Sequence, residues 1–294
     1  MKKYLILIYM SILIFCLAGC NKKDENVQNE KNKKEEVQVE EKKQIIDATG
    51  DSLMTRILVP DGYIRDIAQD NSLTSFIRNY KMKEDGSNVK LYDGTDKSNQ
   101  TAHAAIFALP LENYDLQQCA DSVMRMYAEY YWNTKQYNKI SFHFVNGFEA
   151  KYGLWIKGYK IKLFVNKCTW IRDERADASY ESFKEYLKMV FAYASTISMD
   201  KESVPININD INVGDIFIKA GSPGHVVMVV DVCTNNAGKK AFLLAQGYMP
   251  AQEFHVLKNP AHSDDPWYYV SEISYPLKTP EYTFEEGSLK RPQY

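Results

Sequence analysis

The sequence predicts an α+β domain in which helices pack on an antiparallel sheet, and two patterns carry this prediction. Residues 116–131 and 180–194 repeat apolar side chains at spacings of three and four, which is typical of helices with one buried face. Three short β-branched and aromatic runs follow, at 216–218, 226–232 and 241–244. The Gly-Ser-Pro-Gly and Asn-Asn-Ala-Gly turns between these runs indicate an antiparallel meander. Helices that precede an antiparallel sheet favour the α+β class.

The elements before the first long helix are short. Residues 45–80 read as an irregular entry with a helix near 72–77. Residues 88–92 and 104–109 read as strands around the turn Asp93-Gly94-Thr95.

The strongest predicted helix begins after Asp115. Asp115 can cap this helix, since Gln118 follows three residues later in the reciprocal capping arrangement. One face of the helix is apolar, with Leu116, Cys119, Ala120, Val123, Tyr127, Tyr130 and Tyr131. The pattern therefore places the thiol of Cys119 in the first turn.

The remaining elements follow the same logic. Residues 140–144 and 159–165 read as strands, and a second helix is expected over 179–195. Residues 279–284 are predicted to add an edge strand after the meander.

The first twenty residues predict export. Lys2 and Lys3 precede an apolar run over 4–17, and Leu17-Ala18-Gly19-Cys20 resembles a bacterial lipobox. The resemblance implies that residues 1–19 are a signal peptide and that Cys20 carries lipid, so the membrane would be a partner through this anchor. An uncleaved transmembrane helix is the alternative, but the apolar run is shorter than the nearly 20 residues that a span needs.

The segment after Cys20 lacks the residues of a core. Residues 21–44 alternate Lys and Glu blocks without aromatics, which predicts a disordered tether; a charged single helix is the alternative. Lys23-Asp24-Glu25 resembles a signal for transport to the surface in some Gram-negative lineages. The expected organisation is a signal peptide over 1–19, a lipidated cysteine with its tether over 20–45, and a single α+β domain over 46–294. The expected location is the cell envelope, at the outer membrane and surface-exposed.

Composition and motifs exclude several classes. The net charge is −2 and no basic stripe is present, so nucleic acid is not an expected partner. After loss of the signal and lipidation of Cys20, the thiols of Cys119, Cys168 and Cys233 remain, an odd number. No CxxC, HExxH, GxxxxGK[ST] or GxGxxG motif occurs, so we predict no metal and no cofactor.

The candidate site joins a thiol, an imidazole and an amide. Strand alternation puts His225, Val227, Val229 and Asp231 on one face of the middle strand and Phe242, Leu244 and Gln246 on one face of the next. His225 and Gln246 are thus expected to meet near adjacent strand ends.

Each group has a chemical job. A helix N-terminus and an imidazole favour the thiolate of Cys119, which makes it the candidate nucleophile. His225 is the candidate base and Gln246 the group that orients its ring. Asp121 and Arg125, further along the same helix, are candidates for substrate contacts or an internal ion pair. The alternative is a histidine that is simply hydrogen-bonded at a strand end.

The order of these residues resembles the papain-like cell-wall hydrolases of the NlpC and CHAP types. The resemblance covers residues 118–129 and 214–246. Those families carry Asp or Asn directly before the cysteine, where this chain has Gln118. The 95 positions between Cys119 and Gly214 would require an insertion. The resemblance implies a papain-like arrangement of helices packed on the antiparallel sheet.

A second, longer resemblance covers almost the whole domain over 46–294. The strings DLQQCADSVMR, FVNGF, YESFKEYLKMVFAYA, VGDIFIKAGSPGHVVMVVD and LLAQGYMPAQ resemble the domain of unknown function 4846 family of bacterial lipoproteins. This resemblance implies an exported lipoprotein and brings no catalytic residues with it.

The sequence therefore favours two alternative functions for the domain over 46–294. The leading hypothesis is a lipid-anchored cysteine hydrolase that cleaves amide bonds in a peptide or cell-wall substrate. The alternative is a noncatalytic lipoprotein that binds a glycan, peptide or protein through an aromatic platform. Its candidate aromatics are Trp132, Trp155, Trp170, Trp267, Tyr268 and Tyr269, for which core packing is the competing explanation.

Overall fold

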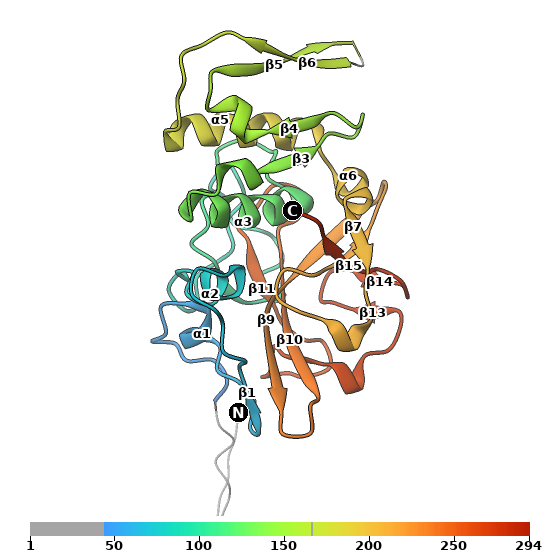
Figure 1. Cartoon of the computed structure of the whole chain (residues 1–294). Helices are drawn as coiled ribbons and strands as arrows, with labels where there is room; N and C mark the ends of the chain where they lie inside the picture. The colour runs from blue at the N-terminus through green and yellow to red at the C-terminus, as the bar shows by residue number, and fades with distance from the viewer. Residues whose placement is uncertain (1–43, 166) are drawn as a thin grey trace, which may run out of the picture. The chain divides into compact units, whose positions relative to one another are not determined.

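An antiparallel sheet of nine strands organises the domain in the computed structural model, which describes residues 44–165 and 167–294 (Figure 1). Its strand order is β2-β11-β10-β9-β8-β15-β7, while β1 pairs with β9 and β12 with β10. The strands are β1 (Tyr63–Ile64), β2 (His103–Ile106), β7 (Ser203–Pro205), β8 (Ile216–Lys219), β9 (His225–Asn235), β10 (Lys240–Gln246), β11 (His255–Leu257), β12 (Tyr268–Tyr269) and β15 (Leu289–Pro292). Every strand pair of this sheet is antiparallel.

The central strand β9 is buried on both faces. Val226, Met228 and Val230 belong to one hydrophobic core, whereas Val227 and Val229 belong to a second core on the other face. A strand that is covered on both sides reads in the sequence as a continuous apolar run, as residues 226–230 do. The first core includes the apolar side of the helices. The second is closed by the C-terminal segments.

The predicted meander is confirmed. β8 pairs with β9 and β9 with β10, each across a short turn. Strict alternation along β9 is interrupted, however. Leu243 and Leu244 of β10 pair with Asp231 and Val229, so the register skips Val230 of β9. Such a bulge re-aims the side chains that follow it. The predicted shared face of His225 and Asp231 therefore fails: the Asp231 carboxylate pairs with Arg65 and Arg78, at 2.6 and 2.7 Å.

Two long helices are present in the described part of the chain. They are α3 (Cys119–Asn133) and α5 (Tyr180–Tyr193), and α3 packs on β9 and β10. The other α-helices have four to six residues: α1 (Leu53–Arg56), α2 (Leu73–Arg78), α4 (Tyr152–Trp155) and α6 (Thr196–Lys201). Single 3₁₀ turns lie at Tyr137–Lys139, Ile208–Asp210 and Val270–Glu272.

Three separate hairpins complete the domain. They are β3 (Ser141–His143) with β4 (Glu149–Lys151), β5 (Tyr159–Phe164) with β6 (Lys167–Arg172), and β13 (Leu277–Lys278) with β14 (Thr283–Phe284). In Figure 1 the β5–β6 hairpin lies beyond α5, on the side away from the nine-stranded sheet. The first two hairpins and α5 lie in the chain between Cys119 and Gly214.

The predicted α+β fold in a papain-like arrangement, with helices packed on the sheet, is wrong. The domain is mostly antiparallel sheet, and one face of that sheet is covered by non-helical chain. Phe284 of β14, Leu277 of β13 and Ile211 belong to the core on that face. Seven of the nine strands have only two to four residues: β1, β2, β7, β8, β11, β12 and β15. Runs that short carry too little alternation to be recognised in a sequence.

Some element boundaries also differ from expectation. The helix with Cys119 begins at Cys119 itself with Gln118 as its N-cap, so Asp115 is not the cap. Residues 88–92 form only isolated bridges, at Lys90 and Leu91. The expected edge strand over 279–284 is reduced to β14, which pairs with β13 outside the main sheet. Helix α2 and the strands β3 and β5 lie where they were predicted.

The predicted signal peptide, the lipidated Cys20 and nearly all of the tether fall on residues 1–43, outside the described residues. Across residues 44–165 and 167–294, none of the helices combines the length and the apolar character that a membrane crossing requires.

Candidate functional site

Cys119 is the first residue of helix α3, so it lies in the first turn as predicted, although Gln118 and not Asp115 is the N-cap. The backbone N–H of Gln118 donates to Oδ2 of Asp121 at 3.1 Å, which ties the N-cap to the third helical residue. Asp115 supports the turn before the helix, since its Oδ1 accepts from Nε2 of Gln118 at 3.0 Å and from the Ala251 N–H at 2.7 Å. The helix start is thereby joined to the segment that follows β10.

The thiol of Cys119 is buried, with 7% of the residue exposed. Burial and the nearby Asp121 raise its pKa to about 11, against the opposing effect of the N–H groups of Ala120, Val226 and Cys119 itself. Val226 directly follows His225 in β9. The sulfur therefore lies where the start of α3 meets the start of β9, and at neutral pH it is a thiol.

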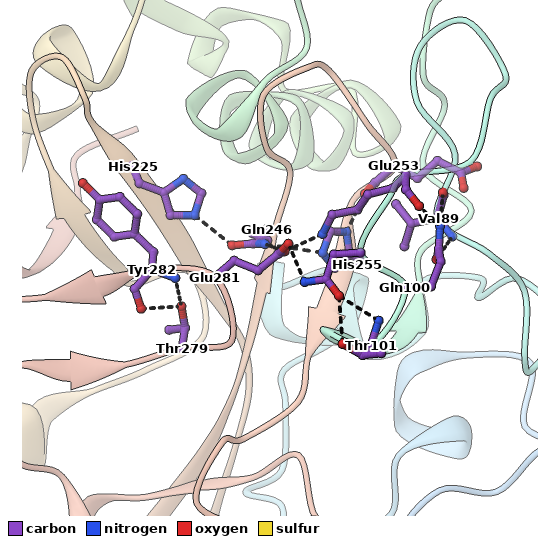
Figure 2. A network of polar contacts seen from close by, with 12 residues as sticks. Val89, Gln100, Thr101, His225, Gln246, Glu253, His255, Thr279, Glu281 and Tyr282 are labelled. Atoms are coloured by element: carbon purple, nitrogen blue, oxygen red, sulfur yellow. Dashed lines mark hydrogen bonds and ion pairs between the residues drawn. The ribbon is translucent and has the colours of Figure 1, made fainter.

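His225 is the first residue of β9 and is 2% exposed. Its Nε2 lies 2.8 Å from Oε1 of Gln246, the last residue of β10 (Figure 2). The predicted meeting of these side chains is confirmed. Because an amide oxygen only accepts, Nε2 carries the ring proton and Nδ1 is the basic atom. Burial lowers the pKa of His225 to about 4, so the ring is neutral at pH 7.

Aromatic side chains pack around the imidazole. The ring of Tyr248 lies 4.7 Å from it, that of Tyr282 4.8 Å and that of Phe284 6.0 Å, measured between centroids. These contacts restrict the ring plane while the Gln246 bond fixes its rotation. The imidazole is therefore held in one orientation.

Two glycines allow the strand ends to approach the helices. A Cβ on Gly224, just before His225, would lie 2.4 Å from the carbonyl oxygen of Gly221 and 2.6 Å from Oγ1 of Thr196. A Cβ on Gly247, just after Gln246, would lie 2.3 Å from Oγ of Ser122 in α3. Neither position has room for a side chain.

A pocket of about 230 Å³ opens over the thiol. The start of α3, with Gln118, Cys119 and Asp121, lines it together with the loop 221–224 that leads into His225. Residues at the end of α5 and the start of α6 also line it. The hydroxyl of Tyr282 donates to the carbonyl of Pro223 at 3.4 Å, which ties this loop to the β13–β14 hairpin.

The thiol of Cys119 lies beside the backbone N–H of Val226, the residue that follows His225. In the part of the chain that the structure describes, no hydrogen bond joins the Cys119 sulfur to the His225 ring. Catalytic hydrogen bonds often tighten only when substrate binds. The Cys119 thiol at the start of α3 and the His225 imidazole at the start of β9 are thus both neutral.

Asp121 and Arg125 have different environments. Asp121 lines the pocket and is 6% exposed, and its Oδ1 is buried without a hydrogen-bond partner. Burial raises the pKa of Asp121 well above its usual value. Arg125 is fully buried and forms an internal ion pair with Glu129 at 2.7 Å, with further bonds to Gln117 and Tyr180. Of the two, Asp121 is the side chain available to a ligand.

The other two described cysteines lie elsewhere. Cys233 is buried near the end of β9, and burial raises its pKa to about 12. Cys168 lies on β6 of the outer hairpin and accepts a hydrogen bond from Asn146 at 3.2 Å. No histidine is bonded to either sulfur among the described residues.

Sequence reasoning missed the polar groups behind Gln246. Its Nε2 donates to Oε2 of Glu281 at 2.8 Å, and Glu281 forms an ion pair with Lys97. His255 of β11 lies beside the same amide, 3.5 Å away, and burial lowers its pKa to about 3. Within residues 44–165 and 167–294, no group of three or more His, Cys, Asp or Glu side chains is arranged to hold a metal.

Comparison with known proteins identifies the family. The profile described as a domain of unknown function (4846) matches residues 53–291, which span the described sheet and the site. The chain therefore belongs to this family, as its sequence strings suggested. No curated protein matches the chain, and no solved structure does.

Proposed function

We propose that the protein is an exported lipoprotein, anchored to the cell envelope through Cys20, whose domain is a cysteine hydrolase of amide bonds in peptide or cell-wall substrates. One observation carries the enzymatic part. The Nε2–H of His225 is committed to Gln246 at 2.8 Å, and Val226, the next residue, places its N–H toward the sulfur of Cys119. His225 is the first residue of β9 and the thiol lies beside the N–H of the second, so the basic Nδ1 atom and the thiol both belong to the region around this strand end.

The chemistry follows from these positions. As a substrate carbonyl enters the pocket, Nδ1 of His225 takes the thiol proton and the sulfur of Cys119 adds to the carbonyl carbon. The N–H groups at the start of α3 would donate to the oxyanion that forms. When the C–N bond breaks, the imidazolium returns its proton to the leaving amine and a thioester remains. Water, deprotonated by the same ring, then releases the acid and restores the thiol.

A neutral resting pair suits this sequence of proton transfers. Burial raises the pKa of Cys119 and lowers that of His225, so neither group is charged before substrate arrives. The imidazolium forms only with the thiolate. Its partner Gln246 is neutral and can stay bonded to Nε2–H in both protonation states.

Anchoring through Cys20 rests on the sequence alone. The lipobox resemblance, the short apolar run and the charged segment over 21–44 support an exported domain on a membrane-bound tether.

The second candidate is a noncatalytic envelope lipoprotein. The raised pKa of the buried Cys119 thiol favours it, because a packed thiol is inert. An aromatic binding platform has less support: Trp155, Trp267 and Tyr268 are 5% exposed or less and belong to the hydrophobic cores.

Trapping the thioester separates the two functions. The full chain is incubated with an activated acyl donor, such as the p-nitrophenyl ester of an N-acyl amino acid, and then quenched in acid. Peptide mass spectrometry should find an acyl group on Cys119 that hydroxylamine removes, and His225→Ala should abolish it. Cys233 in the same digest is the matched buried thiol. Acylation spread over all thiols, or retained in His225→Ala, would leave the noncatalytic lipoprotein as the better account.

A further inference from the structure

The side-chain amide of Gln246 is held at both ends. Its Oε1 accepts from His225 at 2.8 Å, and its Nε2 donates to Oε2 of Glu281 at 2.8 Å. Figure 2 shows Gln246 between the imidazole and this carboxylate. A carboxylate paired with a lysine only accepts, so it selects the N–H end of the amide. Glu281 thereby directs the oxygen of Gln246 to His225.

Glu281 is itself fixed by two further groups. Nζ of Lys97 forms an ion pair with Oε2, and Nδ2 of Asn99 donates to Oε1 at 3.0 Å. The side chains of Lys97 and Glu281 are 8% and 11% exposed, so water competes little for this pair. Both carboxylate oxygens are occupied, which leaves Glu281 one orientation.

The charges of Glu281 and Lys97 also affect the pKa of His225. Burial is the main cause of the low pKa of His225. The hydrogen bond with Gln246 and the charge of Glu281 raise this pKa, whereas the charge of Lys97 lowers it further. The rings of Tyr248 and Tyr282 pack against the imidazole, and His255 lies beside the amide. Glu281 is the acid that accepts from Gln246.

We propose that Glu281 is a positioning residue: with Lys97 it locks the amide of Gln246, and through that amide it fixes His225 as the Nε2–H tautomer with Nδ1 as the base. The tautomer follows from the hydrogen bonds alone. Its consequence for catalysis rests on the proposed function. Residues from three distant parts of the chain, near 97, 246 and 281, thus control one imidazole.

Loss of the acceptor should release the amide. In Glu281→Ala, Gln246 can turn its NH₂ group toward Nε2 of His225, which requires the Nδ1–H tautomer. In Glu281→Gln, the new side-chain oxygen can still accept from Gln246, so the original tautomer should persist. A merely structural role for the ion pair predicts loss of stability in both variants without a change of tautomer.

Long-range ¹H–¹⁵N spectra of the full chain, ¹⁵N-labelled at its histidines, report the tautomer of each ring. His225→Gln assigns the signal. We expect Nε2–H in the wild type and Glu281→Gln, and a substantial Nδ1–H fraction in Glu281→Ala. Asp200→Ala, which removes a lysine-paired acid elsewhere, at Lys290, should leave the signal unchanged. An unchanged tautomer in folded Glu281→Ala overturns the proposal.

A second variant covers the case in which Glu281→Ala does not fold. Glu281→Met keeps a side chain of similar length but has no oxygen to accept from Gln246, so a substantial Nδ1–H fraction is expected there too. A pure Nε2–H signal in folded Glu281→Met, with Glu281→Ala unfolded, counts equally against the proposal.

Alkylation of Cys119 by iodoacetamide separates this inference from the proposed function. Glu281→Ala should slow the reaction about tenfold, in line with the loss of one hydrogen bond in a charged network, with Glu281→Gln close to the wild type. A wild-type rate that His225→Ala does not change would defeat the proposed function alone, because the tautomer shift would still establish positioning. A normal rate in folded Glu281→Ala, with His225→Ala slowed, would defeat the positioning role alone.

Discussion

Gly247 touches Ser122 so closely that a Cβ on the glycine would lie 2.3 Å from the serine Oγ. This contact joins the end of β10 to the first turn of α3. It lies one residue from Gln246 and three residues from Cys119 along their elements. The spacing between strand end and helix start, on which the site depends, is therefore set by the absence of a side chain.

Gly247→Ala should destabilise the domain by about 1–3 kcal/mol, the range for overpacking a tight contact. Ser122→Ala should be nearly neutral, because the Ser122 Oγ is buried without a hydrogen-bond partner. In the double variant the closest clash is gone, so the loss should be smaller than in Gly247→Ala. Urea unfolding of the four proteins measures this cycle. Strictly additive losses would mean that the two residues do not press on each other.

Stability should fall as the pH drops from 7.5 toward 4. Burial lowers the pKa of His225 to about 4 and that of His255 to about 3, from 6.5. The unfolded chain therefore binds protons first, and each contribution, complete above about pH 6.5, is lost as the pH falls through the folded pKa. Between pH 7.5 and 5 this amounts to about 2 kcal/mol per histidine. Urea unfolding of His225→Gln should show a loss smaller by that amount, and an identical loss would contradict the prediction.

Asp121→Asn should stabilise the protein at pH 7. Burial raises the pKa of Asp121 well above 3.8, so its contribution is present below that value and lost as the pH rises through the folded pKa. Asparagine retains an oxygen that can accept from the Gln118 N–H. The gain over wild type should vanish near pH 3.5 in thermal melts. Asp121→Asn should also lower the pKa of Cys119, since Asp121 is the second cause of its elevation. A pH-independent gain would show that ionisation of Asp121 is not involved.

Local pattern predicted the meander well, for physical reasons. Residues 226–232 and 241–244 are buried on both sides of the sheet, and two turns with Gly leave few alternative pairings. The bond between His225 and Gln246 could be anticipated because neighbouring strand ends fix which side chains meet.

Local sequence patterns could not predict the pairing of distant strands or the non-helical chain that covers one face of the sheet. β15 closes the sheet between β8 and β7 after more than 60 residues of intervening chain, and a run of four residues carries no period of its own. Glu281 appears in the sequence as one acid among many. Its role follows only from the fold, which brings it to Gln246 and Lys97.

Cys20 should be the first residue of the mature protein and should carry lipid. Mass spectrometry of the N-terminal peptide checks this directly. Cys20→Ser should leave a water-soluble domain with an unchanged melting temperature, because residues 53–291 hold the family domain. Cys16→Ser, within the predicted signal peptide, is the matched control and should not alter the mature product. An intact Met1 on the wild-type protein would contradict the lipobox prediction.

Cys119 should react with iodoacetamide at pH 7 faster than Cys233, although burial raises the pKa of both thiols, to about 11 and about 12. The expected difference comes from proton transfer to Nδ1 of His225, which Cys233 lacks. His225→Ala should slow Cys119 about 100-fold, the scale of general-base assistance, and leave Cys233 unchanged. The rate at Cys119 should also fall as the pH drops through about 4, where His225 becomes protonated. Peptide mass spectrometry of timed samples gives both rates in one experiment. If the two thiols react alike and His225→Ala changes neither, Cys119 is a packed core residue and the protein acts by binding.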